Sequence, residues 1–152
     1  MDRKKKIKVN AIKNGTVIDH ISAGRGLKVI DILDLENDNL VMIGMNLESK
    51  KLKKKDIIKI ENKELSKEEV NSIALVAPKA TLIIIKDFEV ISKTSLEMPD
   101  FIEEHIICPN PKCITNLEDI SSKYYVNNSQ IATARCVYCE KKYLVDNLKI
   151  KL

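Results

Sequence analysis

Hydrophobic and polar residues alternate with a period of two over residues 7–11, near the start of the chain, and a second largely apolar stretch follows at residues 17–21. This period is typical of a strand that is buried on one face. Asn14 and Gly15 lie between the two stretches, and an Asn-Gly pair readily adopts the positive φ angles of a tight turn. The pattern therefore predicts a strand that turns at this pair and then resumes.

Three further stretches predict strands. Residues 40–47 form an almost continuous apolar run, which is typical of a strand covered on both faces. Apolar positions alternate again near the end of residues 55–61. Residues 81–91 are rich in β-branched side chains, which favour strands, and Lys86 and Asp87 interrupt them. We expect one long strand there.

Two segments have the periodicity of helices. Apolar residues recur at helical spacing over residues 27–35 and over residues 70–77. Ser66 and Glu69 form a capping box before the second segment, because each side chain can bond the backbone N–H of the other. Pro78 ends this helix, since proline cannot continue the helical hydrogen bonds.

The predicted order in residues 1–98 is strand, helix, strand, strand, helix, strand. This order is that of a ferredoxin-like α+β fold, an antiparallel sheet with two helices on one face. Its open face can bind a ligand or a second copy. A hinge at residues 97–99 leads into residues 99–152, a segment that needs a metal to support so small a core. We expect a small zinc-bound β domain there. Its short strands are predicted at residues 124–126, 131–135 and 143–146.

The chain contains four cysteines in two pairs, Cys108 with Cys113 and Cys136 with Cys139. Paired thiolates on two short loops are typical of one tetrahedral zinc ion. No histidine or carboxylate replaces a thiol at ligand spacing, so a structural role is predicted, with one Zn²⁺ per chain. Two disulfides are the alternative. We expect a cytoplasmic protein with reduced thiols, because no signal peptide is recognised.

Composition and charge refine this picture. With 44% hydrophobic but only 4% aromatic residues the core is predicted to be aliphatic, and no apolar run has the length of a membrane span. The net charge of +4 is confined to residues 1–98, which hold 19 basic and 15 acidic residues, whereas residues 99–152 hold 7 of each. Four thiolates and one zinc ion bring the net charge of residues 99–152 to about −2, and a negative charge disfavours contact with phosphates.

No set of side chains typical of a catalytic centre can be assembled from the sequence, so the chain is predicted not to be an enzyme. Asp19 and His20 end an apolar strand, while Lys59 and Lys93 are isolated cations on predicted strands. Taken alone, Asp19-His20 is more typical of a surface strand end. If the sheet brings the four residues together, an acid, an imidazole and two ammonium groups can bind a ribose and a polyphosphate.

Several motifs together resemble one family. They are Gly-Thr-Val-Ile-Asp-His-Ile within residues 11–21, the segments at residues 55–62 and 77–81, and the knuckles Cys-Pro-Asn-x-x-Cys and Cys-x-Tyr-Cys-Glu. On these motifs the chain resembles the regulatory chain of aspartate carbamoyltransferase over about residues 7–142. The resemblance implies a non-catalytic subunit of pyrimidine biosynthesis. Residues 1–98 would bind nucleotides, and residues 99–152 would dock on the catalytic chain.

The resemblance also implies effectors, partners and site residues. CTP and ATP are expected as ligands, with UTP added in some family members. The expected partners are the catalytic chain and a second regulatory chain, and neither nucleic acid nor membrane. The edge at residues 40–47 is our candidate for pairing in the regulatory dimer. Ribose contacts are implied for Asp19 and Lys59, and phosphate contacts for His20 and Lys93. The full set of nucleotide-site positions is Ile12, Val17, Asp19, His20, Lys59, Ile85, Val90 and Lys93, and the catalytic-chain contacts are Asn110 and Glu140.

Within this set, Ile12 and Ile85 are expected to offer backbone groups and apolar walls to the base. Three positions depart from the best-known family members. Ile83 stands where they have Asn, and Phe88 stands where they have Tyr, so an amide and a hydroxyl are missing from the expected nucleotide site. Lys112 replaces the second Asn of the first knuckle. We therefore expect altered nucleotide affinity or choice and a partly changed interface with the catalytic chain.

The alternative hypothesis is a nucleic-acid-binding zinc-ribbon protein. It would use the lysines of residues 50–55 and those near the N-terminus as phosphate contacts. The neutral second part and the scarcity of aromatic side chains for base stacking argue against it. A lysine cluster of this kind usually belongs to a solvated hairpin, which is our interpretation here.

Overall fold

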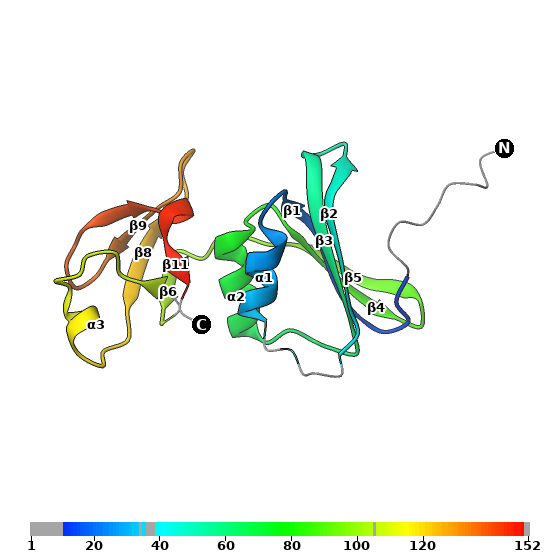
Figure 1. The fold of residues 1–152 in the computed structure, drawn as a ribbon, viewed down its shortest axis with the longest axis horizontal. Helices are drawn as coiled ribbons and strands as arrows, with labels where there is room; N and C mark the ends of the chain where they lie inside the picture. Colours follow the sequence, from blue (N-terminus) through cyan, green and yellow to red (C-terminus); the bar gives the residue numbers. More distant parts are fainter. Residues whose placement is uncertain (1–10, 34, 36–38, 105, 151–152) are drawn as a thin grey trace.

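The computed structural model describes the chain at residues 11–33, 35, 39–104 and 106–150 (Figure 1). The strand predicted at residues 7–11 lies outside this part except for its last residue. Two hydrophobic cores are present, one between a sheet and two helices and the other around the cysteines. The helices lie between the first sheet and the second core (Figure 1). Among the described residues, no helix has both the length and the hydrophobicity needed to traverse a lipid bilayer.

The first sheet has five strands in the order β2-β3-β1-β4-β5, and every neighbouring pair is antiparallel. Two helices cover one face. The predicted ferredoxin-like α+β arrangement is thus confirmed, with one additional strand. The elements are β1 (Gly15–Ser22), α1 (Gly26–Ile32), β2 (Val41–Ser49), β3 (Lys53–Glu61), α2 (Lys67–Val76), β4 (Thr81–Lys86) and β5 (Glu89–Ser95).

The helix-facing side of the sheet is isoleucine-rich and fully buried. Ile18 and Ile58 lie opposite each other on β1 and β3, and both pack toward Ile73 of α2 within one core. The capping box of α2 is confirmed, because Ser66 Oγ accepts from Glu69 N at 3.1 Å and Ser66 N donates to Glu69 Oε1 at 3.0 Å. This cap satisfies two N–H groups that the first helical turn would otherwise leave unpaired.

The prediction of one long strand over residues 81–91 was wrong. The chain instead folds back between β4 and β5, and the two connecting residues, Asp87 and Phe88, both have positive φ angles of 51° and 66°. This geometry is that of a tight hairpin, which glycine or asparagine normally signals. Their N–H groups are held by Asn14 and Lys13, which lie before β1. Contacts that are distant in sequence therefore support a turn that lacks the usual local signal.

The predicted burial of residues 40–47 on both faces was also wrong. A strand does form there, but β2 is the edge strand of the sheet. Ile43 and Met45 are 40% and 42% exposed. The apolar run therefore belongs to an unpaired edge, where apolar side chains can serve contact with another chain.

The second core lies in a small β unit, as predicted. Tyr124 and Ile102 pack against the cysteines there, and Leu75 of α2 reaches the same core. A four-stranded sheet has the order β10-β9-β8-β6, and β11 pairs with β7. The elements are β6 (Phe101–Glu103), β7 (Ile106–Ile107), α3 (Ile114–Leu117), β8 (Lys123–Asn127), β9 (Thr133–Cys136), β10 (Lys142–Leu144), a 3₁₀ turn (Val145–Asn147) and β11 (Lys149–Ile150).

A buried carboxyl group joins three segments of the first unit. Asp56 on β3 is fully buried. Its Oδ2 accepts N–H bonds from Gly24 at 3.0 Å and Gly26 at 2.9 Å, and its Oδ1 accepts from Asn46 at 3.0 Å. A Cβ atom on Gly26 would lie 2.9 Å from Asp56 Oδ2, so this close approach needs glycine. The start of α1 and the irregular part of β2 are thereby fixed to the middle of the sheet.

We expect Asp56→Ala to lower the free energy of unfolding by about 3–5 kcal/mol, because three buried N–H groups lose their acceptor at once. Urea denaturation of the full chain measures this change. Asp31→Ala removes an exposed carboxylate from α1 and should stay within about 0.5 kcal/mol of the unmodified protein. Equal stability of the two variants would contradict the structural role of Asp56.

Candidate functional site

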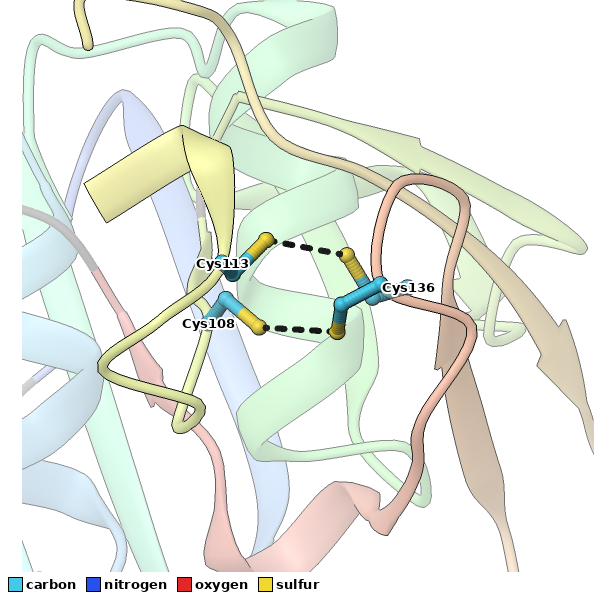
Figure 2. A group of neighbouring side chains, drawn as sticks. Cys108, Cys113 and Cys136 are labelled. Carbon is cyan, nitrogen blue, oxygen red and sulfur yellow. Dashed lines mark hydrogen bonds between the residues drawn. The ribbon is translucent and has the colours of Figure 1, made fainter. Parts of the chain in front are cut away.

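The four cysteines converge in the second unit. Cys108 and Cys113 lie on the loop between β7 and α3, Cys136 ends β9, and Cys139 lies in the turn that follows. Their sulfur atoms all lie within 4.8 Å of one another, and the Cys108–Cys139 and Cys113–Cys136 pairs are each 3.7 Å apart. In Figure 2 the three labelled cysteines point toward a common centre. The four thiols are free and form no disulfides.

These distances suit a single metal ion. Four sulfur atoms placed about 2.3 Å from a central ion, at the corners of a tetrahedron, would be about 3.8 Å apart. Burial is the largest influence on the Cys136 thiol and raises its pKa to about 12. Burial acts in the same direction on Cys139, but N–H donors, led by that of Lys141, outweigh it and lower the pKa of this thiol to about 7. A bound cation is needed to ionise the whole set.

Tyr124 packs in the same core as the cysteines. Its hydroxyl is buried and forms no hydrogen bond of normal geometry with the described residues, although the Cys108 sulfur lies close enough to influence it. Burial, followed by the nearby Cys108 sulfur, raises the pKa of this hydroxyl, so it keeps its proton. A metal-bound thiolate at Cys108 would give the hydroxyl an acceptor, because a thiolate accepts hydrogen bonds more strongly than a thiol.

Backbone contacts set the shape of the first knuckle. Asn116 donates from Nδ2 to the carbonyl oxygens of Cys108 and Asn110, at 2.8 Å and 2.7 Å. Cys113 N donates to the same Asn110 oxygen, and Thr115 Oγ1 donates to Cys113 Sγ at 3.2 Å. Asn116 was not identified from the sequence, because an asparagine in a short helix has no local signal for a contact with a preceding loop.

Asn110 and Glu140, the expected contacts with the catalytic chain, are both placed on the knuckles. Asn110 Oδ1 accepts from Lys112 N at 3.1 Å, so the substituted lysine is part of the same turn. Glu140 follows the second knuckle with a φ of 62° and an exposed side chain. Exposed apolar residues follow or lie within the knuckles, among them Leu117 at the end of α3, which is 69% exposed, and Tyr138, which is 40% exposed.

The open face of the first sheet brings the other predicted residues together. Lys59 lies opposite Val17, Val17 lies opposite Ile83, and Ile83 lies opposite Lys93, so these four residues form one row across β3, β1, β4 and β5. Opposite residues in antiparallel strands point to the same side. Ile18, Ile58 and Leu82, which are next to this row on β1, β3 and β4, belong to the helix-side core, so the row lies on the side that the helices leave uncovered.

Two adjacent rows carry the remaining positions. Asp19 pairs with Thr81 on one side of the central row, and Gly15, Ile85 and Val90 form the row on the other side. Ile12, which precedes β1, is buried, while Val90 on the edge strand is exposed. All the positions expected for a nucleotide therefore lie on, or directly beside, one surface of the sheet.

An irregularity in β1 shapes the polar end of this surface. The register of β1 against β3 shifts between Ile18 and Ile21, and His20 has a φ of 56°. The Asp19 carboxylate accepts from His20 N at 2.6 Å. His20 Nδ1 lies 3.0 Å from Thr81 Oγ1, which leaves Nε2 as the ring atom available to a ligand. Bulges of this kind redirect side chains, and here two successive polar residues are turned toward one place.

Lys55 is a member of this site that sequence reasoning missed. Its Nζ lies 2.8 Å from Asp19 Oδ1, and both side chains are largely buried. The lysine-rich pattern of residues 50–55 predicts a solvated hairpin and gives no sign of this contact. The contact arises because Lys55 lies opposite Ser22 across the irregular part of β1, which no local pattern reveals.

The charges of this group are mutually adjusted. Burial is the largest influence on Asp19 and favours its protonated form, but the hydrogen bond and charge of Lys55, together with His20 N, outweigh it and lower the pKa of Asp19. Burial lowers the pKa of His20, and nearby lysines, including Lys93, lower it further against the opposing charge of Asp19. Burial also lowers the pKa of Lys59. Without a ligand, His20 is therefore mostly neutral at pH 7.

Family models match both units of the chain. Residues 7–97 match the aspartate carbamoyltransferase regulatory chain, allosteric domain, and residues 100–149 match the metal binding domain of the same chain. Aspartate carbamoyltransferase regulatory chains are also among the similar curated proteins. That of Pyrococcus abyssi is 54% identical over 138 residues, which cover 89% of this chain and 91% of the relative. That of Thermococcus sibiricus is 48% identical over 147 residues and 97% of each chain. That of Methanothermobacter thermautotrophicus is 42% identical over 153 residues and 98% of each chain.

We expect the four-cysteine cluster to bind one divalent ion per chain in tetrahedral geometry. Cobalt(II) added to the chelator-treated protein should give the intense visible bands of a tetrahedral thiolate complex. Cys113→Ser should lose these bands, because it removes a buried ligand. Ser129→Ala, at an exposed position away from the cluster, is the control and should keep them. A weak octahedral cobalt spectrum from the unmodified protein would contradict the assignment.

Proposed function

The chain belongs to the family of aspartate carbamoyltransferase regulatory chains, and from this premise we propose that it binds CTP and ATP to control the catalytic chain, with UTP as a further candidate ligand. It is the regulatory and not the catalytic subunit. The observation that carries the proposal is the row of Lys59, Val17, Ile83 and Lys93 on the open face of the sheet, with Asp19 and His20 beside it.

The arrangement supports separate places for sugar and phosphate. Asp19 accepts hydrogen bonds from ribose hydroxyls, and Lys59 lies in the row beside it. His20 Nε2 and the Lys93 ammonium face the phosphates, and Lys93 is close enough to influence the pKa of His20. Three strand spacings separate Lys59 from Lys93, which amounts to roughly 14 Å. A bound nucleotide spans this distance with its sugar near one lysine and its phosphates near the other.

The base lies against apolar walls in this proposal. Ile85 and Val90 pair across β4 and β5, and Ile12 is buried where the chain enters β1. Ile83 occupies the middle of the surface and offers no side-chain hydrogen bond. Phe88 lies in the β4–β5 turn and is 64% exposed. Base recognition therefore depends on backbone groups and shape, which favours modest discrimination between a pyrimidine and a purine.

The second unit docks on the catalytic chain, and its metal is zinc. Four thiolates with no open position suit structural zinc, which stabilises the loops that carry Asn110 and Glu140. Thiolate ligands of this kind belong in a reducing compartment, so we place the protein in the cytoplasm. We assign residues 1–98 to nucleotide binding and residues 99–152 to docking.

A second copy of the chain pairs along β2 in this proposal. β2 is an edge strand, and Ile43 and Met45 are half-exposed on it. An apolar edge with free backbone groups is suited to continuing a sheet into a partner. By contrast, nothing in the described residues favours the alternative of nucleic-acid binding. Lys55, one of the lysines that it would use, is engaged by Asp19.

We expect CTP and ATP to bind the zinc-loaded chain saturably in calorimetric titration, and more tightly at pH 6.5 than at pH 8. The unliganded pKa of His20 is lowered, and adjacent phosphates must raise it, so binding takes up a proton and strengthens as pH falls. His20→Gln should lose this part of the pH dependence. The nucleotide's own protonation is common to both proteins and cancels in the comparison.

Lys93→Ala should weaken nucleotide binding about tenfold or more, because a charge-assisted contact with phosphate is lost. Lys67→Ala removes the same charge from the exposed surface of α2 and serves as the matched control. Inorganic triphosphate tests for attraction by charge alone. Absence of binding by both nucleotides, or binding no tighter than that of triphosphate, would overturn the proposed site.

We expect Cys113→Ala to abolish both zinc binding and assembly with catalytic trimers, because the docking loops lose their support. Gel filtration with the catalytic chain and metal analysis of the fractions measure the two effects. The variant should still bind CTP, which shows that the first unit remains folded. Chelation of the unmodified protein should give the same loss, reversed by added zinc, and a complex that survives chelation would contradict this role.

A further inference from the structure

A continuous set of contacts leads from the open face of the first sheet to the metal-binding unit. Resting on the nucleotide site proposed above, we propose that Arg25 couples occupancy of that site to the position of the metal-binding unit. The two helices lie between the sheet and that unit (Figure 1). A signal from the open face must therefore pass through the sheet to the helix side before it can reach the second unit.

The first step crosses the sheet at β3. Lys55 and Asp56 are consecutive, so their side chains point to opposite faces. Lys55 pairs with Asp19 on the open face, at 2.8 Å. Asp56 is buried on the helix side and holds Gly24 N and Gly26 N at 3.0 Å and 2.9 Å. A change in the ion pair on one face therefore acts on the residue that fixes the start of α1 on the other.

The second step crosses from α1 to the metal-binding unit. Arg25 lies between the two glycines whose N–H groups Asp56 holds. Its guanidinium donates to the carbonyl oxygen of Val76, at the end of α2, at 3.3 Å. The same guanidinium lies 3.2 Å from Asp146 Oδ1 in the 3₁₀ turn of the metal-binding unit. Arg25 thus touches both helices and the second unit, while the glycines on either side of it are held by Asp56 of β3.

The junction around this contact has room for movement. A cavity of about 280 Å³ lies there, lined by Arg25 and Asp146 together with apolar residues such as Leu75, Ile106 and Ile150. Leu75 belongs to the second core, and Ile150 packs against both cores. Apolar contacts of this kind hold the units together but are non-directional. The ion pair is directional, so it can distinguish one orientation from another.

A nucleotide changes the first link of this set. Its ribose hydroxyls bond Asp19, so the carboxylate that Lys55 contacts gains new partners and the ion pair is altered. Only contacts that differ between two arrangements of a protein can shift their equilibrium. The arrangement of Asp56, Gly24 and Gly26 then favours or disfavours the Arg25–Asp146 contact. The position of the metal-binding unit that this contact stabilises is favoured or disfavoured with it.

The test uses the assembled enzyme and two single variants, Arg25→Met and Asp146→Asn. Arg25→Met keeps most of the aliphatic packing of the side chain, and Asp146→Asn removes only a charge from a side chain that is 75% exposed. In each, the change in activity caused by saturating CTP should fall at least twofold below that of the unmodified enzyme. Both residues act through one contact, so the two effects should not add. The CTP-induced change in activity of the double variant should be no smaller than that of whichever single variant has the smaller change.

Three controls separate coupling from binding. The isolated variant chains should bind CTP within about twofold of the unmodified chain, and should retain zinc and assembly. Lys28→Met, on the exposed side of α1 near the same junction, should leave the response unchanged. An unreduced CTP-induced change in activity in both Arg25→Met and Asp146→Asn overturns the inference but leaves the proposed function intact. If the variants lose this change in activity because they no longer bind CTP, the inference is likewise overturned and the proposed function stands. Failure of the unmodified chain to bind CTP overturns the proposed function itself and the inference with it.

Discussion

The carboxyl group of Asp56 holds together segments that the chain builds at widely separated positions. A buried carboxylate is costly unless hydrogen bonds replace its hydration, and buried N–H groups are costly without an acceptor. The three amides of Gly24, Gly26 and Asn46 meet both requirements at once. Because Lys55 precedes Asp56 and faces Asp19, the open face of the sheet and the start of α1 are positioned by neighbouring residues of one strand. The proposed nucleotide site and the helix layer are therefore not mechanically independent.

The surface that faces a nucleotide depends on strand order more than on any local motif. Lys59, Val17, Ile83 and Lys93 come from four strands, and they meet because β1 lies between β3 and β4 and because β5 folds back on β4. A shift of one residue in any of these pairings would turn the affected strand's side chains to the other face. The isoleucine core on the helix side prevents such a shift, since it would expose buried apolar surface. Packing on one face thus maintains the chemistry of the other.

This dependence explains which features the sequence could predict. Both cysteine knuckles and the capping box of α2 are local patterns, and each could be recognised from a few adjacent residues. The β4–β5 turn could not, because Asp87 and Phe88 lack a glycine signal and are held by residues before β1. The exposure of β2 depends on its place at the sheet edge, not on its composition. Lys55 and Arg25 were missed for the same reason, since their partners lie across the sheet or in the other unit.

The contact between Arg25 and Asp146 suits a coupling role because it is weak. Exposed ion pairs typically contribute about 0–1 kcal/mol, so making or breaking this one changes an equilibrium by at most about fivefold. A stronger polar contact would fix a single arrangement, and the junction could then no longer respond to a ligand. The apolar contacts of Leu75 and Ile150 supply the constant part of the association. The apolar contacts attach the metal-binding unit, and the ion pair sets its orientation. A small change at Asp19 can therefore alter the orientation without weakening the attachment.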